Sequence, residues 1–470
     1  MKTSFINKYA KTFALLFTVF LSAAFSQAQD ITGQWNGALT VQGKNLRLVF
    51  HINKTGEGYT STMDSPDQGA KGIPVTTTAF DGSKLLLQIP AAGISYEGEF
   101  KNDAIEGTFK QSGMSFPLTL KKDSGELKPA ARPQEPKPPF PYISEDVIFE
   151  NKAVGVALAG TLTMPSAGND FTAVILISGS GPQDRNEEIM GHKPFMVIAD
   201  YLTRRGIAVL RYDDRGFGQS TGDFTTSTTE DFADDAESAI VYLKTRKEIN
   251  PKKIGLMGHS EGGIIAPTVA ARSNEVAFIV MLAGTGIRGD ALMLLQAEAV
   301  YRASGMPEAQ IAGQLKINSR VFDRIVNAKE TVSPREIFDF MTGMKADIEA
   351  VMPEGITTDD YIKQVVTQVS NPWMQYFLRY DPAPALEKVK CPVLAVNGGR
   401  DLQVPAKENF AAISAALKKG GNKNVTMKEY PGLNHLFQEC DTGLPAEYGI
   451  IEQTFSPEVL KDLADWIADQ

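Results

Sequence analysis

From residue 142 onward, short apolar runs alternate with segments of helical pattern, and this alternation restricts the fold more than any other feature of the sequence. Runs that are apolar at nearly every position are typical of strands buried on both faces, as in parallel sheets covered by helices. The sequence therefore predicts an α/β domain over residues 142–470, with a mostly parallel sheet and its functional groups at the carboxyl ends of the strands. The runs are TAVILIS, IAVLRYD, KIGLMGH, VAFIVMLAG, PVLAVNG and the more polar VTMKEY, and the helical patterns cover residues 194–205, 230–247, 264–273, 407–418 and 457–468.

A helix-rich insertion at about 287–385 interrupts this alternation. A long excursion from one strand end usually forms a cap over the functional site. The insertion carries an aromatic cluster with Trp373, Tyr376 and Phe377. These side chains either pack the cap onto the sheet domain, which is the commoner use of such a cluster, or line the substrate pocket.

Residues 29–122 have a different pattern, which predicts a small all-β domain. In NLRLVFHI the apolar residues alternate with others at period two, as in a half-buried strand. Turn signals at Asp81-Gly82 and Asn102-Asp103 separate similar short runs and favour an antiparallel arrangement. Residues 123–141 follow as a linker, since KPAARPQEPKPPFP contains six prolines, which fix φ and remove hydrogen-bond donors.

Residues 1–28 resemble a secretory signal peptide. Three lysines precede an apolar run from Thr12 to Phe25, and Ser26-Gln27-Ala28 supplies small residues for cleavage. About 14 apolar residues are fewer than the roughly 20 that a membrane span needs, so we expect no stable span. The mature protein is then secreted or periplasmic. Removing three lysines and no acidic residue moves the formal net charge from −9 to −12, which disfavours nucleic acid or anionic membranes as partners and favours a small molecule.

The stretch GHSEGG, residues 258–263, predicts a nucleophilic serine. A strand pattern enters it and a helical pattern leaves it, which is the context of a nucleophile elbow. The sharp turn needs small residues beside the serine, and Gly258, Gly262 and Gly263 meet that need. Ser260 is therefore the predicted nucleophile. The backbone N–H of Glu261 is placed to face an oxyanion.

A serine nucleophile needs a general base and an acid that orients the base. Of the histidines, His51 lies in the β domain, His259 adjoins the serine and His192 precedes it. His435 directly follows the last predicted strand, and Asp401 follows the strand PVLAVNG. Both positions are at carboxyl ends of strands, so the sequence predicts Ser260, Asp401 and His435 as a catalytic triad.

The loop GSGPQDRN, residues 179–186, follows the first long strand and can bring a second N–H to the oxyanion, from Ser180 or Gly181. Three charged residues after the next strand, Asp213, Asp214 and Arg215, are predicted to brace loops and not to catalyse. The chain has no Cys/His cluster with the spacing of a zinc site, and no metal is expected.

As an ordered set, GSGPQDRN, DDRGFGQS, GHSEGG, GGRDLQVP and GLNHLF resemble the loops of the α/β-hydrolase superfamily, similar to secreted bacterial esterases and the serine-aminopeptidase branch. The resemblance covers residues 142–470. It implies Ser260, Asp401 and His435 as catalytic residues, a cap domain and no cofactor. The oxyanion loop has Ser-Gly-Ser-Gly in place of the HGGG form, and the resemblance implies no activity for the β domain.

Ester hydrolysis of small acyl groups is the first functional expectation, because esters are the least demanding acyl donors. A serine peptidase or aminopeptidase of the same fold is the alternative, and it would need an anchor for a free amine, such as Glu354, Asp359 or Asp360 in the cap. A binding protein on an inactive hydrolase fold is a third reading, which the intact triad disfavours. The sequence does not indicate an oligomeric state.

Overall fold

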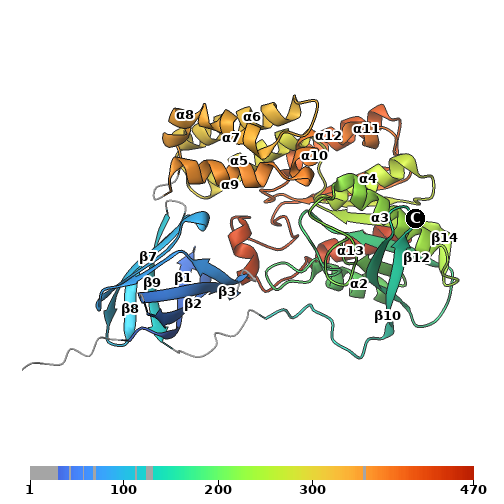
Figure 1. Ribbon diagram of the computed structural model, residues 1–470. Coiled ribbons are helices and arrows are strands. Elements are labelled where there is room, and N and C mark those ends of the chain that lie inside the picture. Colours follow the sequence, from blue (N-terminus) through green and yellow to red (C-terminus); the bar gives the residue numbers. More distant parts are fainter. Residues whose placement is uncertain are drawn as a thin grey trace, which may run out of the picture.

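The computed structural model describes residues 30–41, 44–56, 58–66, 70–111, 114–122, 131–352 and 356–470. The expected signal peptide therefore lies outside the described residues, as does the first part of the proline-rich linker. Two sheets dominate the described chain, an antiparallel one near the N-terminus and a mixed one in the remainder (Figure 1).

The N-terminal unit is all-β, as the alternating patterns predict. Within the described residues, nine strands form one sheet in the order β4-β3-β2-β1-β9-β8-β7-β6-β5, with antiparallel neighbours. The sheet curls until β3 approaches β5, and its core contains Trp35, Phe50 and Tyr96. Asn102 and Asp103 adopt φ of 49° and 61° in the β7–β8 turn, as a two-residue hairpin turn requires. The strands are β1 (Gly33–Val41), β2 (Lys44–Thr55), β3 (Gly58–Ser65), β4 (Ala70–Val75), β5 (Thr77–Phe80), β6 (Lys84–Ile89), β7 (Ile94–Lys101), β8 (Ala104–Gln111) and β9 (Met114–Lys122), with a short 3₁₀ helix, η2 (Pro90–Ala92), between β6 and β7.

Eight strands within residues 131–352 and 356–470 form the second sheet, in the order β10-β11-β13-β12-β14-β15-β16-β17. The hairpin β10–β11 joins β13 antiparallel, and the strands from β13 to β17 pair in parallel. The carboxyl ends of β14, β16 and β17 therefore meet at one edge. The strands are β10 (Tyr142–Asn151), β11 (Val156–Pro165), β12 (Phe171–Ile177), β13 (Ala208–Tyr212), β14 (Ile249–His259), β15 (Ile279–Leu282), β16 (Val393–Gly398) and β17 (Val425–Tyr430).

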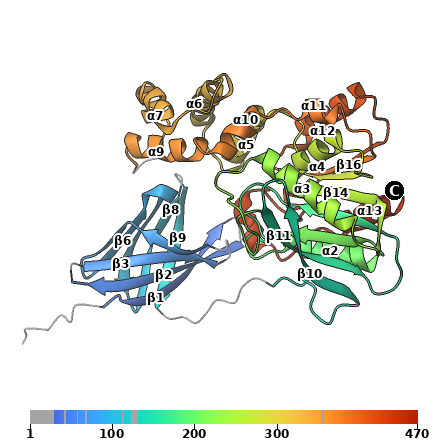
Figure 2. The same ribbon diagram turned by 45° about the vertical axis from the view of Figure 1, so that its right-hand side comes forward.

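Helices cover both faces of this sheet (Figure 2). On one face, α2 (Pro194–Arg204) and α13 (Pro457–Ala468) share a core with the outward side chains of the central strands. On the other face, α3 (Thr229–Leu243), α4 (Gly262–Arg272) and α12 (Ala406–Lys419) bury apolar side chains against the opposite side of the sheet. Because the central strands are buried on both sides, they are apolar at nearly every position.

The predicted insertion leaves the sheet after β15 and returns at β16. Its helices have a core of their own, which includes Ile325, Met341 and Leu378. Figure 1 shows the insertion, in yellow and orange, above both sheets. Its helices are α5 (Gly289–Ala303), α6 (Glu308–Val326), α7 (Pro334–Thr342), α8 (Lys345–Glu349), α9 (Thr358–Val369), α10 (Pro372–Arg379) and α11 (Ala383–Leu386).

The 3₁₀ helix η3 (Pro445–Ile450) connects the two units. Its Ile450 packs against the core of the β unit, and η3 lies beside β2. Linker residue Arg132 donates to the carbonyl oxygens of Gly449 and Ile451 at 2.8 Å each. In the described part of the chain, no helix is both long and apolar enough to cross a membrane.

Candidate active site

Ser260 occupies a strained turn between β14 and α4. Its φ is 52°, a left-handed value that non-glycine residues rarely adopt, and its N–H donates to the carbonyl of Leu282 at 2.9 Å. A Cβ on Gly258 would lie 1.8 Å from the carbonyl oxygen of Gly262, and one on Gly262 would lie 2.2 Å from that of Ile177. The glycines of GHSEGG are thus required by close backbone approach, as the sequence predicts for an elbow.

Asp401 and His435 meet at the same edge of the sheet. Nδ1 of His435 lies 2.8 Å from Oδ2 of Asp401, and the side chains are almost completely buried, with 4% and 0% of their surface exposed. Oδ1 of Asp401 accepts the backbone N–H groups of Gln403 and Val404, at 2.8 Å each. The carboxylate is therefore held by its own loop while its other oxygen faces the histidine.

The loop that carries His435 is tied to the elbow through His259. Nε2 of His259 lies 3.0 Å from the carbonyl oxygen of His435, and the centroids of the two rings are 4.8 Å apart. Because His259 immediately precedes Ser260 in the chain, this contact brings the two loops together. The structure thus places all three predicted triad residues at one sheet edge, on loops that touch.

The loop after β12 lies against the serine. A Cβ on Gly179 would lie 3.2 Å from Cβ of Ser260, and the N–H of Gly179 donates to Oε1 of Glu187 at 2.7 Å. The N–H of Gly179 therefore already donates to a side chain and is not free to donate to an oxyanion. Ser180 is exposed, and a Cβ on Gly181 would meet nothing within 4 Å, so both predicted donor positions lie on the open part of this loop.

The side chain of Glu261 has a role that the sequence did not reveal. Its carboxyl group is buried, and Oε1 accepts a hydrogen bond from Thr229 Oγ1 at 2.6 Å and from Trp373 Nε1 at 2.7 Å. Burial raises the pKa of this carboxyl to about 7, against the two hydrogen bonds, which lower it. The residue next to the nucleophile thus joins helix α3 to the insertion.

Comparison with known proteins identifies the family of this chain. Residues 193–441, more than half of the chain, match the family model described as serine aminopeptidase, S33. The chain belongs to this family of α/β hydrolases. The esterase EstD of Thermotoga maritima is 28% identical over 322 residues, which are 68% of this chain and 68% of EstD. The solved structure of the Pyrococcus furiosus esterase Pf2001 covers 70% of this chain and 93% of its own, with 17% identity and a TM-score of 0.42.

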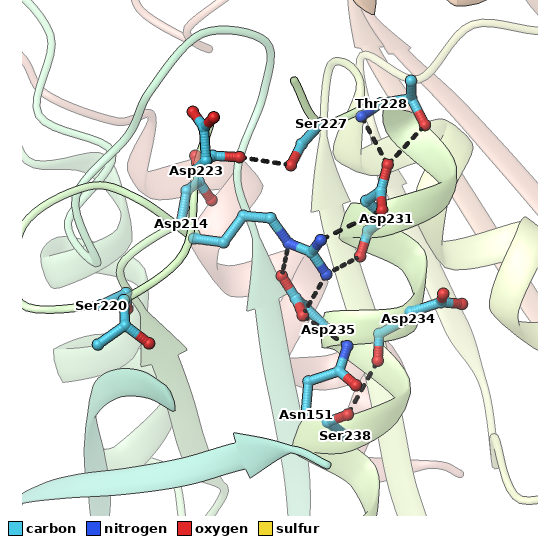
Figure 3. A network of polar contacts seen from close by, with 12 residues as sticks. Asn151, Asp214, Ser220, Asp223, Ser227, Thr228, Asp231, Asp234, Asp235 and Ser238 are labelled. Carbon is cyan, nitrogen blue, oxygen red and sulfur yellow. Dashed lines mark hydrogen bonds and ion pairs between the residues drawn. The ribbon is translucent and has the colours of Figure 1, made fainter. Parts of the chain in front are cut away.

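In this α/β hydrolase, the charged residues after β13 brace the loops around the site, as predicted. Asp213 holds Arg185, with Nη2 to Oδ2 at 2.8 Å. Asp214 accepts from Ser178 Oγ at 2.7 Å, and burial raises its pKa well above the usual range. Arg215 reaches α3, where its Nε donates to Asp235 Oδ2 at 2.6 Å. Figure 3 shows the polar network around Asp231 and Asp235 on this helix.

The aromatic cluster of the insertion packs against the hydrolase core. Phe377 stacks on Trp373 with ring centroids 5.2 Å apart, and it shares a small buried cluster with Ile264 of α4 and Val404 of the Asp401 loop. Tyr376 donates to Glu230 Oε2 of α3 at 3.2 Å. These contacts agree with the packing alternative. A role in substrate binding stays a prediction for all three aromatics.

Of the acidic residues considered as an amine anchor, two lie at the start of α9 and one lies outside the described chain. Asp360 accepts the hydroxyl of Thr357 at 2.8 Å at the start of α9, and Asp359 lies in the same first turn. Glu354 is outside the described residues. Among the residues that the structure describes, there is no group of three or more His, Cys, Asp or Glu side chains placed to hold a metal ion.

Proposed function

We propose that this protein is a serine hydrolase that cleaves carboxylic esters, with Ser260 as nucleophile, His435 as base and Asp401 as the acid that orients it. The observation that carries the proposal is the 2.8 Å contact between His435 Nδ1 and Asp401 Oδ2, beside a strained serine elbow. An N–H at Nδ1 directed at the carboxylate leaves Nε2 free to accept a proton. The relationship to the esterase EstD supports esters as substrates.

In the proposed mechanism, Nε2 of His435 removes the hydroxyl proton of Ser260 as its oxygen attacks the ester carbonyl. The backbone N–H of Glu261 and one from Ser180 or Gly181 stabilise the oxyanion. His435, now charged and balanced by Asp401, gives its proton to the leaving alcohol, and an acyl-enzyme remains. Water activated by the same histidine then releases the acid.

The triad is tested by substitution. Ser260→Ala should abolish turnover while the melting temperature stays close to that of the wild type, because the hydroxyl serves chemistry and not packing. Asp401→Asn should reduce kcat by about 10³- to 10⁴-fold, since the neutral amide no longer balances the histidine charge. A serine-reactive phosphonate should label the wild type and not Ser260→Ala. Normal turnover in Ser260→Ala, or no labelling of the wild type, would refute the proposal.

We propose further that the insertion acts as a cap that limits the acyl group to a small one. Phe377 and Leu292 of the insertion pack with Ile264 and Val404, close to the serine elbow and the Asp401 loop. Bulky walls favour short acyl chains, because an overfilled pocket strains its lining. Acetyl to butyryl esters should therefore have a higher kcat/KM than esters beyond about eight carbons. A steady rise of kcat/KM with chain length would contradict this size limit.

Aminopeptidase activity is the second candidate, because the matched family is described as serine aminopeptidase. A peptidase would need a carboxylate that binds the substrate's free amine. Parallel assays on acyl esters and on aminoacyl amides separate the two candidates, since an aminopeptidase cleaves amides only when the α-amine is free. Hydrolysis that requires the free amine would favour this candidate over the esterase.

Export is also proposed, on the basis of the basic start, apolar run and small residues within positions 1–28. The protein would then act in a secreted or periplasmic location on small neutral substrates. N-terminal sequencing of the protein recovered from outside the cytoplasm tests this, with cleavage expected after Ala28. Recovery of the uncleaved chain in the cytoplasm alone would contradict it.

A further inference from the structure

A second histidine and a glutamate form a buried pair in contact with the loop of His435. Glu187 and His259 are both buried, with 4% and 6% of their surface exposed. Oε1 of Glu187 lies 2.9 Å from Nδ1 of His259 and accepts the N–H of Gly179 at 2.7 Å. On the other side of the ring, Nε2 of His259 lies 3.0 Å from the carbonyl oxygen of His435. One pair thus contacts the oxyanion loop, the elbow and the His435 loop.

The partners of His259 determine its protonation state. A carbonyl oxygen only accepts hydrogen bonds, so Nε2 must carry a proton. Oε1 of Glu187 accepts the N–H of Gly179 and also faces Nδ1, and a carboxylate oxygen has no proton to donate, so Nδ1 carries a proton as well. A ring with protons on both nitrogens is a cation. Burial opposes this charge, but Glu187, the carbonyl group of His435 and Asp401 together outweigh burial and raise the pKa of His259.

His192 provides a contrast within the same chain. It is also fully buried, with Nε2 2.7 Å from the carbonyl oxygen of Tyr448 and Nδ1 3.0 Å from the hydroxyl of Thr454. A hydroxyl can donate as well as accept, so a neutral ring satisfies both contacts. Burial and the nearby Arg132 lower the pKa of His192 to about 4. Both histidines are buried, with 0% and 6% of their surface exposed, and their hydrogen-bond partners differ in kind.

We propose that Glu187 and a protonated His259 act as positioning residues, which hold the oxyanion loop, the serine elbow and the His435 loop in the arrangement that catalysis needs. This inference rests on the proposed function, because it assumes that these three loops form the active site. Neither side chain is required to touch the substrate. Loss of either charge would leave a nitrogen lone pair facing an oxygen, or a carboxylate without its cation, at the point where the loops meet.

The charged and titratable groups around His259 set the direction of the pH dependence. They are Glu187 from the loop after β12, Asp401 from the loop after β16 and His435 from the loop after β17, with Asp214 within electrostatic range of Glu187. The folded protein raises the pKa of His259. The stabilisation of the loops by protonated His259 is therefore complete at low pH and is lost as the pH rises through that raised value. Turnover should therefore fall at alkaline pH as His259 loses its proton.

The first test is the charge state itself. Nitrogen-15 NMR of the imidazole side chains should find protons on both ring nitrogens of His259 at neutral pH, and on one nitrogen of His192. The same result is expected in Ser260→Ala, which is inactive under the proposed function. A ring nitrogen of His259 without a proton at neutral pH would overturn the inference. Turnover that survives in Ser260→Ala would instead refute the proposed function, and the spectrum of His259 would still be interpretable.

The second test separates positioning from simple stability. Glu187→Gln should lower kcat by about 10²-fold and change KM by less than about threefold, because misplaced catalytic groups affect the chemical step more than binding. The alkaline limb of its kcat profile should move to lower pH, since His259 has lost its counter-charge. His192→Gln is the control, which should lower the melting temperature and keep the wild-type pH profile. A Glu187→Gln enzyme with the wild-type kcat and alkaline limb would overturn the inference.

Discussion

Replacing Trp373 with phenylalanine tests how the insertion is fastened to the nucleophile elbow. The change removes the indole N–H that donates to Glu261 Oε1 at 2.7 Å, while a ring remains to stack on Phe377. Thr229 is then the remaining donor of the two that the structure records for this buried carboxyl. We expect the loss to depend on the charge of Glu261, because a hydrogen bond to a carboxylate is stronger than one to a neutral carboxyl.

The raised pKa of Glu261 decides at which pH Trp373→Phe costs more free energy of unfolding. Burial raises the pKa of Glu261 from 4.5 to about 7, so stability associated with its protonated form is lost as the pH rises through about 7. A hydrogen bond to a charged group contributes about 1.5–3 kcal/mol and a neutral one about 0.5–1.5 kcal/mol. Trp373→Phe should therefore cost about 1 kcal/mol more free energy of unfolding near pH 9 than near pH 6. It should also raise the pKa of Glu261 by about one unit.

The assay is urea unfolding followed by circular dichroism at the two pH values. The lost packing of the indole contributes equally at both, so the difference isolates the charge. Trp466→Phe is a matched control, because the indole N–H of Trp466 donates to a neutral acceptor, Thr426 Oγ1, at 3.3 Å. The control should lose the same free energy at both pH values. Equal losses for Trp373→Phe near pH 6 and near pH 9 would refute the reasoning.

Two further predictions concern the support of the site. Arg215→Met should reduce the free energy of unfolding by about 3–5 kcal/mol, because it leaves the buried Asp235 carboxylate without its cation, and Asp235→Asn in the same chain should recover part of the loss in urea unfolding. A loss below about 1 kcal/mol would mean that the pair is not effectively buried. Arg132 and Gln134 donate to carbonyl groups between Gly449 and Phe455. A chain that begins near residue 140 lacks both residues, so its melting temperature should be lower than that of a chain that begins at residue 131. Equal melting temperatures would show that these linker contacts do not stabilise η3.

The sequence determined those features that depend on local pattern and on chain order. Apolar runs and helical periodicity predicted the strands and helices of the α/β domain, because burial on both faces of a sheet leaves a clear signal in each run. Since parallel strands end at one edge, Ser260, Asp401 and His435 could be assigned to that edge from their positions after β14, β16 and β17. In the β unit the signal was weaker, and β1, β3, β4 and β5 were not individually predicted.

The tertiary structure decided which side chains face one another across long stretches of chain. Glu187 and His259 are 72 residues apart, and Glu261 and Trp373 are 112 residues apart. No local pattern marks such partners, because the residues that flank a glutamate do not reveal whether its side chain is solvated or buried against a distant histidine. Removal from water raises the pKa of Glu261, whereas the acceptors that the fold places around His259 raise its pKa against the effect of burial. The sequence could therefore nominate the reacting groups, whereas only the packed structure could identify the groups that hold them in place.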